Sequence, residues 1–267
     1  MGIMTPKRTG SSLFVVAMLA TTGLPASGQT PAEPGPLITD RPDHTESPVA
    51  IAPGWLQLEA GYSLEREGEI TTHNLGETLA RFGLVPRLEF RLGFPSVQLD
   101  REAGETIGGL ADITLGLKWQ LTAPGAEPGW TPGLALIGAV SLPTGSADVR
   151  ALGAEPEAIL AAGWILTPRL ALGSNLSWVG KEDDDGRFDQ FGASAVMAYG
   201  LLEPLGVFFE YFGEFPSGSG RDLRNFLDTG LTHLICADFQ IDARIGLALD
   251  GPSPGYFVGA GLVWRTR

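Results

Sequence analysis

The chain has 267 residues, of which 43% are hydrophobic and 18% are charged, and its formal net charge is −13. This acidic balance, with no lysine and arginine cluster beyond the first ten residues, excludes DNA and RNA as partners. The single cysteine, Cys236, excludes an intramolecular disulfide, and three scattered histidines supply no metal cluster. Glycine accounts for 37 residues, about twice its usual share, which favours β-structure over helical bundles.

The first 28 residues have the order of a secretory signal peptide. Lys7 and Arg8 precede an apolar run at 13–20, and small residues lead up to Gly28, after which we expect cleavage. The alternative is a membrane anchor, but the run is shorter than the about 20 residues that a helix needs to cross a bilayer. No later stretch is apolar over such a length. The exported chain is therefore either soluble outside the cytoplasm or a β-barrel.

Residues 29–53 are rich in proline and polar side chains and show no periodicity, so we expect an extended N-terminal arm. The arm carries a dense polar cluster at 39–47, directly before the first predicted strand. This cluster either folds into the mouth of a barrel, where it pairs with charges of the lumen as a plug or constriction, or forms a solvated linker. The Arg41-Pro42-Asp43 core favours the ordered role.

From Gly54 onward, apolar and polar residues alternate, which is the period of a strand with two unlike faces. This pattern predicts twelve strands, at 54–65, 77–85, 87–95, 109–121, 132–142, 156–166, 169–180, 189–200, 205–215, 225–235, 238–249 and 255–265. Many are about ten residues long, the length of a tilted bilayer crossing, whereas strands of soluble sheets average about five or six.

The connections between these strands alternate in length. Short turns at 85–87, 167–168, 203–204 and 236–237, with a longer turn at 122–131, alternate with polar loops near 66–76, 96–108, 143–155, 181–188, 216–224 and 250–254. Outer-membrane barrels have short turns on the periplasmic rim, long loops on the other rim and aromatic girdles near both. All six tryptophans fall near strand ends or in a turn. We therefore predict an all-β fold, a single antiparallel transmembrane β-barrel of about twelve strands at 54–267; a soluble exported β-sandwich or closed barrel is the alternative.

If the apolar faces meet lipid, the charged residues of the opposite faces lie in the lumen. The candidate lumen and constriction residues, from the arm and the strands, are Asp40, Arg41, Asp43, Glu46, Glu59, Arg81, Glu89, Arg91, Asp112, Lys118, Glu210, Asp242 and Arg244. Both signs are present, so many should pair across the lumen. They form either a network that fills a narrow barrel or a polar path for a solute, because twelve strands lie between the filled and the open size classes.

On the second of these alternatives, arginines of the lumen would bind carboxylates of a solute. Arg81, Arg91 and Arg244 are the arginines in question, and Glu59, Glu89 and Asp242 would keep their guanidinium groups oriented.

No sequence motif points to catalysis or to a cofactor. The chain lacks the Gly-x-Ser-x-Gly, phosphate-loop and His-Glu-x-x-His patterns. The acidic segment 182–186 does not have the ligand spacing of a calcium loop, so we interpret it as a solvated loop. We expect no enzyme activity, no catalytic or metal-binding residues and no cofactor.

Several segments together resemble the outer-membrane β-barrel family of transporters assigned to the meta pathway of phenol degradation. They are 38–47 (ITDRPDHTES), 54–62 (GWLQLEAGY), 142–145 (LPTG), 240–246 (QIDARIG) and 257–261 (FVGAG). The resemblance covers nearly the whole mature chain and implies a barrel in the outer membrane of a Gram-negative bacterium with a transport role. Aromatic solutes are implied only by the family label.

We therefore expect an outer-membrane channel that passes small solutes, such as aromatic or organic acids, by passive diffusion through a narrow charged lumen. The N-terminal arm would constrict the periplasmic mouth, and the partners would be outer-membrane lipid and a small-molecule solute. A non-conducting structural or interaction barrel is the first alternative, and an outer-membrane hydrolase is the second. The pattern leaves the oligomeric state open.

Overall fold

The computed structural model describes residues 34–125, 127–218, 220–250 and 255–267, so the predicted signal peptide and the first residues of the arm lie outside the described residues. The strands are Leu56–Glu67 (β1), Ile70–Val85 (β2), Leu88–Phe94 (β3), Val97–Glu102 (β4), Glu105–Leu110 (β5), Ile113–Thr122 (β6), Gly133–Leu142 (β7), Glu155–Thr167 (β8), Leu170–Asp183 (β9), Gly186–Leu202 (β10), Leu205–Pro216 (β11), Arg224–Cys236 (β12), Phe239–Ala248 (β13) and Tyr256–Thr266 (β14). Within the described ranges, no helix is long and apolar enough to cross a membrane.

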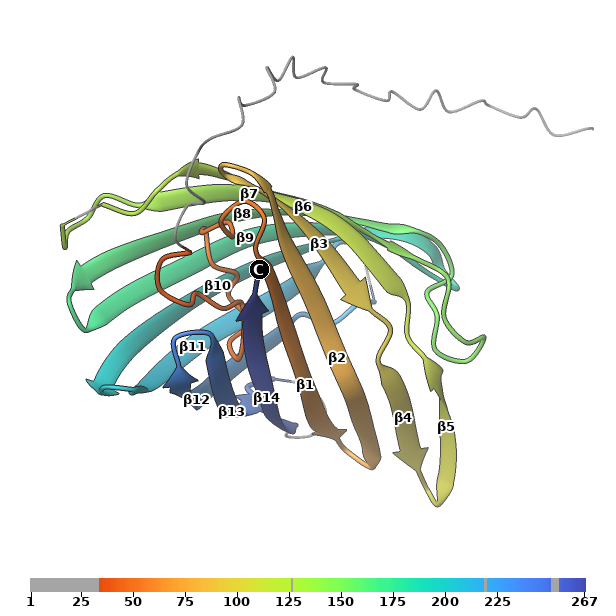
Figure 1. Cartoon of the computed structure of the whole chain (residues 1–267). Coiled ribbons are helices and arrows are strands. Elements are labelled where there is room, and N and C mark those ends of the chain that lie inside the picture. Colours follow the sequence, from red (N-terminus) through yellow and green to blue (C-terminus); the bar gives the residue numbers. More distant parts are fainter. Residues whose placement is uncertain (1–33, 126, 219, 251–254) are drawn as a thin grey trace, which may run out of the picture. The chain divides into compact units, whose positions relative to one another are not determined.

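Twelve of the strands close into an antiparallel barrel (Figure 1). The strand β1 pairs with β2 on one side and with β14 on the other, which closes the sheet. The strand β3 pairs directly with β6, so the β4–β5 hairpin between them, whose β4 pairs with β2, is an extension of the wall. The predicted twelve-stranded barrel is thereby confirmed.

The connections at the two rims of the barrel differ in length, as predicted, but the difference is smaller than predicted. We call the rim that carries the two-residue turns 86–87, 168–169, 203–204 and 237–238 the short-turn rim, and the other the opposite rim. Because Leu56 at the start of β1 pairs with Phe82 near the end of β2, the arm reaches the barrel at the short-turn rim.

Three segments predicted as loops of the opposite rim are instead strands, so that part of the prediction is wrong. The pairs β1–β2 and β9–β10 continue to two-residue turns at 68–69 and 184–185, and the segment 96–108 holds most of the β4–β5 hairpin. These segments lack a continuous apolar face, which is the feature that marks the other strands in the sequence. A strand segment that faces no apolar surroundings does not need alternating apolar and polar residues, but its backbone still pairs with the neighbouring strand.

Polar side chains are buried inside the barrel, and apolar side chains are exposed on its outside. On β6, Lys118 and Gln120 are buried, whereas Leu117 and Trp119 are 47% and 50% exposed. Soluble proteins show the reverse arrangement. An outer surface of this kind suits strands that face lipid, and it leaves charged and amide groups to fill the lumen.

Candidate functional site

The N-terminal arm lies inside the lumen (Figure 1). At the short-turn rim, the Arg265 guanidinium on β14 donates hydrogen bonds to the carbonyl oxygens of Gly35 and Pro36, both at 3.1 Å. At the other end of the arm, the Ile51 backbone N–H donates to the Glu89 carboxylate at 3.0 Å. The arm is thus tied to the wall at both ends, and the residues between these ties lie within the barrel.

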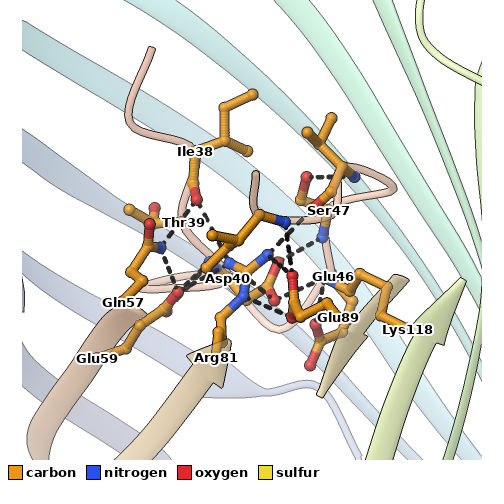
Figure 2. Close-up of polar contacts among 12 residues, drawn as sticks. Ile38, Thr39, Asp40, Glu46, Ser47, Gln57, Glu59, Arg81, Glu89 and Lys118 are labelled. Carbon is orange, nitrogen blue, oxygen red and sulfur yellow. Dashed lines mark hydrogen bonds and ion pairs between the residues drawn. The ribbon is translucent and has the colours of Figure 1, made fainter. Parts of the chain in front are cut away.

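Asp40 is the centre of an ionic network on one side of the lumen (Figure 2). Its Oδ2 lies 2.6 Å from Nη1 of Arg91, 2.7 Å from Nζ of Lys118 and 3.1 Å from Nη1 of Arg81. The Asp40 backbone N–H donates to the Glu59 carboxylate at 3.1 Å. An arm residue thus joins cations from β2, β3 and β6 to a carboxylate of β1.

The wall supplies further carboxylates to the same cations. Arg81 binds Glu59 at 2.9 Å and Glu89 at 2.8 Å, and Arg91 binds Glu46 of the arm at 2.7 Å. The side chains of Arg81 and Glu89 are fully buried. Buried charges of this kind are tolerated only when paired and hydrogen-bonded, so removal of one partner leaves an uncompensated charge.

The two arm carboxyl groups in this network differ in acidity. Burial opposes ionisation of Asp40, but the nearby Arg81, Lys118 and Arg91 outweigh it and hold the pKa of this carboxyl well below its usual range. For Glu46, burial outweighs the attraction of Arg91, and the neighbouring Asp40 charge adds to it, which raises the pKa to about 7. Asp40 is therefore the permanent anion of the network, and Glu46 changes its charge near neutral pH.

On the opposite wall, the arm is held by hydrogen bonds and one ring contact. The His44 backbone N–H and the Thr45 hydroxyl donate to the two oxygens of Glu210 on β11, at 2.6 and 2.5 Å. The His44 ring stacks on Phe212, with ring centroids 4.3 Å apart. The Glu46 backbone N–H donates to the Asn175 side chain on β9 at 2.6 Å. The arm therefore bridges the two walls of the lumen.

Arg41 lies against the seam where β1 meets β14. A Cβ atom placed on Gly61 would stand 2.3 Å from the Arg41 guanidinium, and one on Gly261 would stand 2.5 Å from it. The same guanidinium approaches the carboxylates of Glu77 and Asp242, at 3.6 and 3.5 Å. Two facing glycines thus provide the space in which this arm side chain lies.

The thirteen residues selected from the sequence fall into separate groups. Seven of them form one ionic network: Asp40, Glu46, Glu59, Arg81, Glu89, Arg91 and Lys118. Arg41 pairs with Asp242, and Glu210 binds the backbone of the arm. Asp43 of the arm lines a cavity of the lumen. Asp112 lies apart, at the opposite rim, where it accepts hydrogen bonds from the backbone N–H groups of Gly145 and Ala151.

Two expected roles of the arginines differ from the structure. Arg81 is fully buried and its donors are taken by Glu59, Glu89 and arm carbonyls, so it has none left for a solute. Asp242 pairs with Arg41 and not with Arg244, whose guanidinium lies over the Phe257 ring at 5.1 Å. Both differences involve the arm, which supplies carbonyl oxygens to Arg81 and supplies Arg41 to Asp242. The alternation of apolar and polar residues in the strands does not reveal the path of the arm.

Sequence reasoning missed several residues that hold the arm. They are Gln57, Gln120, Asn175, Ser194, Phe212 and Arg265. For Phe212 a signal existed, since it is two positions from Glu210 on the same strand and therefore shares its inward face. The amides and Ser194 carry no charge, so a search for charged lumen residues passed over them.

Two cavities lie along the wall formed by β8 to β11. The distal cavity, of about 500 Å³, faces the opposite rim and includes Glu157, Lys181 and Glu214 in its lining. The proximal cavity, of about 390 Å³, faces the short-turn rim and includes Arg169 in its lining. Asp43 lines both cavities.

Asp43 therefore lies where the arm separates the two spaces. Burial, together with the charge of nearby Glu210, raises the pKa of the Asp43 carboxyl well above its usual range. Across the described part of the chain, no group of three or more histidine, cysteine, aspartate or glutamate side chains is arranged to hold a metal ion.

Comparison with known proteins identifies a family and a fold. The family described as "Putative MetA-pathway of phenol degradation" matches residues 39–266, and a search of curated proteins found no match. Similar solved structures include the COG4313 outer membrane channel from Pseudomonas putida F1 (TM-score 0.59, 16% identity, 81% of this chain and 97% of that chain) and the NanC porin (0.55, 9%, 78% and 98%). The KdgM porin is similar as well (0.50, 10%, 77% and 98%). At these identities the likeness shows the fold, and the predicted barrel of outer-membrane type is confirmed.

Proposed function

The chain belongs to the phenol-degradation MetA-pathway family, and from this membership and its lumen we propose that it is a channel in the outer membrane of a Gram-negative bacterium. It passes small solutes by passive diffusion. Export depends on the predicted signal peptide at 1–28, and the barrel is embedded in outer-membrane lipid through its apolar outer surface. The likeness to porins and to an outer-membrane channel supports this proposal.

The observation that carries the proposal is the pair of cavities along the β8–β11 wall. They lie on the two sides of the arm, open toward opposite rims, and share Asp43. On the other side of the lumen, a third cavity of about 310 Å³ includes Arg41, Glu59 and Glu77 in its lining. We infer that a solute passes the arm at Asp43, because this residue lines the cavities on both sides of the arm.

The arm is the constriction of this channel. Its ion pairs to one wall and its hydrogen bonds to the other place the segment 40–46 across the lumen. A narrow path beside a fixed plug limits the size of the solute. It also predicts a small conductance for the intact protein and a larger one when the plug is absent.

The test is ion conductance across a planar bilayer, with mature protein refolded in detergent. A boiling-dependent shift on a gel reports the folded fraction of each sample. The intact protein should give small discrete current steps. A variant lacking residues 29–50 should give steps larger by about three-fold or more, since an unplugged twelve-stranded barrel approaches the size of open barrels.

Equal step sizes for the two folded proteins would show that the arm does not limit the path. If neither folded protein conducts, the channel proposal fails and the barrel is a structural or interaction protein. A lipid-hydrolysis assay on the same samples addresses the hydrolase alternative, and we expect no activity above that of a heat-denatured control.

A further inference from the structure

Three buried polar side chains face the arm from neighbouring strands of the wall. They are Asn175 on β9, Ser194 on β10 and Glu210 on β11. Ser194 pairs in register with Asn175 on one side and with Phe212 on the other. Since Glu210 is two positions from Phe212 on the same strand, the three polar side chains share the inner face of the wall and lie at nearly the same level.

Among these three residues, Glu210 binds the arm through both of its carboxylate oxygens. One oxygen accepts a hydrogen bond from the His44 backbone N–H at 2.6 Å, and the other accepts one from the Thr45 hydroxyl at 2.5 Å. The Thr45 hydroxyl also lies 2.7 Å from the hydroxyl of Ser194. Hydrogen bonds to a carboxylate are about twice as strong as those between neutral groups, so Glu210 holds this part of the arm in one position.

The contact of Glu210 with the arm stands between the two cavities. Along β11, the proximal cavity is lined as far as Phe208, and the distal cavity is lined by Glu214. Glu210 lies between these two positions on the strand. On the arm, Asp43 lines both cavities and His44 lines the distal one. The arm segment 43–45, held against β11 by Glu210, therefore separates the two spaces.

The opposite side of the arm is held by different contacts. Asp40 and Glu46 form ion pairs with Arg91 and Lys118, which lie on β3 and β6. These ion pairs do not involve β11, so they can keep the arm in the lumen when the contact with Glu210 is broken. A displacement of the segment 43–45 away from β11 would join the two cavities while the arm stays inside the barrel.

From this geometry we propose that Glu210 is the positioning residue that sets the size of the solutes: its two hydrogen bonds hold the segment 43–45 across the path. The inference rests on the proposed channel function and adds the residue that determines size selection. A solute too wide for the space beside Asp43 passes only when the contact between Glu210 and the arm opens. Glu210 acts through the arm and does not itself line either cavity.

The experiment measures single-channel conductance and the largest polyethylene glycol that enters the path and lowers it. Glu210→Met keeps the length of the side chain but removes both acceptors. It should raise conductance by about two-fold or more and admit larger polymers, because loss of hydrogen bonds to a charged group shifts the contact toward its open form by about ten-fold. The matched control is Glu65→Met on β1, which lies outside both cavities and should leave the polymer cut-off unchanged.

Glu210→Gln separates hydrogen bonding from charge. The amide has no charge, but its oxygen can accept from the His44 N–H and its NH₂ group can donate to the Thr45 oxygen, so we expect the cut-off of the intact protein. Thr45→Val breaks the contact from the arm and leaves the whole wall in place, which covers the case in which Glu210→Met does not fold. It should also raise the cut-off, and its effect should be less than additive with that of Glu210→Met.

The outcomes separate this inference from the channel function. An unchanged cut-off in folded Glu210→Met or folded Thr45→Val overturns the inference while the channel function stands. So does an equal increase in Glu65→Met, or in Glu210→Gln, since the effect would then come from lost charge and not from the hydrogen bonds to the arm. Absence of current from every folded protein, including the variant that lacks residues 29–50, overturns both.

Discussion

Asp40 joins three cations of the wall, because all three lie close to one of its carboxylate oxygens. Arg81, Arg91 and Lys118 lie on three strands, and each depends on Asp40 for part of its compensation. Removal of the Asp40 charge would leave the three buried cations without part of their compensation and would destabilise the folded barrel. The same contacts that narrow the lumen therefore also neutralise its wall.

Asp40→Asn should destabilise the folded barrel. The amide keeps the shape of the side chain but leaves the three buried cations short of one negative charge, which typically costs about 3 kcal/mol or more. The measurement is the urea midpoint of the heat-modifiable folded form. Asp222→Asn, an exposed loop carboxylate, should change stability by less than about 0.5 kcal/mol. Equal midpoints for the two variants would mean that the network does not stabilise the barrel.

Glu46 predicts how stability depends on pH. Its pKa of about 7 in the folded protein lies above its ordinary value of 4.5, so the folded state binds more protons than the unfolded state between these values. The stability that this group contributes is fully present below about pH 4.5 and is lost as the pH rises through about 7.

Relative to Glu46→Gln, the wild-type protein should therefore lose stability between about pH 5 and pH 8. The comparison uses unfolding midpoints of the two proteins across that range, since other titrating groups contribute equally to both. A difference that stays constant, or that grows in favour of the wild type with rising pH, would contradict the pKa assigned to Glu46.

At the scale of the element, the arm binds inside the barrel through non-covalent contacts, as a separate peptide ligand would. Its contacts are side-chain pairs with Arg91 and Lys118 and backbone hydrogen bonds with Glu210 and Asn175, none of which requires the chain to be continuous with β1. A synthetic peptide of residues 34–53 should therefore close the channel that lacks residues 29–50. Single-channel recording at rising peptide concentration measures this block.

The matched control is the same peptide with Asp40 and Glu46 replaced by asparagine and glutamine. It keeps the hydrogen-bonding backbone but lacks the two charges that pair with Arg91 and Lys118. We expect block to need at least about ten-fold more of this peptide, since each lost charge-assisted contact weakens binding. Equal block by the two peptides would place the arm's affinity in its backbone contacts.

The strands could be predicted from the sequence, and the path of the arm could not. Strands that face lipid on one side and the lumen on the other must alternate, so β6 or β13 is visible in the sequence as a period of two. Parity also placed Arg81 and Glu89 on the inner face, where they pair. The contact of Glu46 with Asn175 joins residues 129 positions apart, and no local pattern contains it.

At the scale of the whole molecule, the arm completes the charge pairing in the interior of the barrel. The wall alone carries Arg81, Arg91 and Lys118 against Glu59 and Glu89, and the arm adds the carboxylates that bring these cations close to balance. Water cannot enter the fully buried part of this network, so the charges must be matched by protein groups. The arm therefore contributes to the stability of the closed barrel as well as to the narrowing of its lumen.

The outer surface gives a final prediction, because its apolar residues are stable only in contact with lipid. Ile245 on β13 and Ile107 on β5 are exposed to almost the same degree, 53% and 54%, but Ile245 lies in the barrel wall and Ile107 in the β4–β5 hairpin beyond it. Ile245→Arg should lower the free energy of unfolding in lipid by about 2–4 kcal/mol, the cost of a cation on the lipid face of a barrel. Ile107→Arg should change it by less than about 1 kcal/mol if the hairpin stands outside the hydrocarbon layer. Urea unfolding in vesicles of defined lipid measures both, and an equal loss for the two variants would mean that the membrane also covers the hairpin.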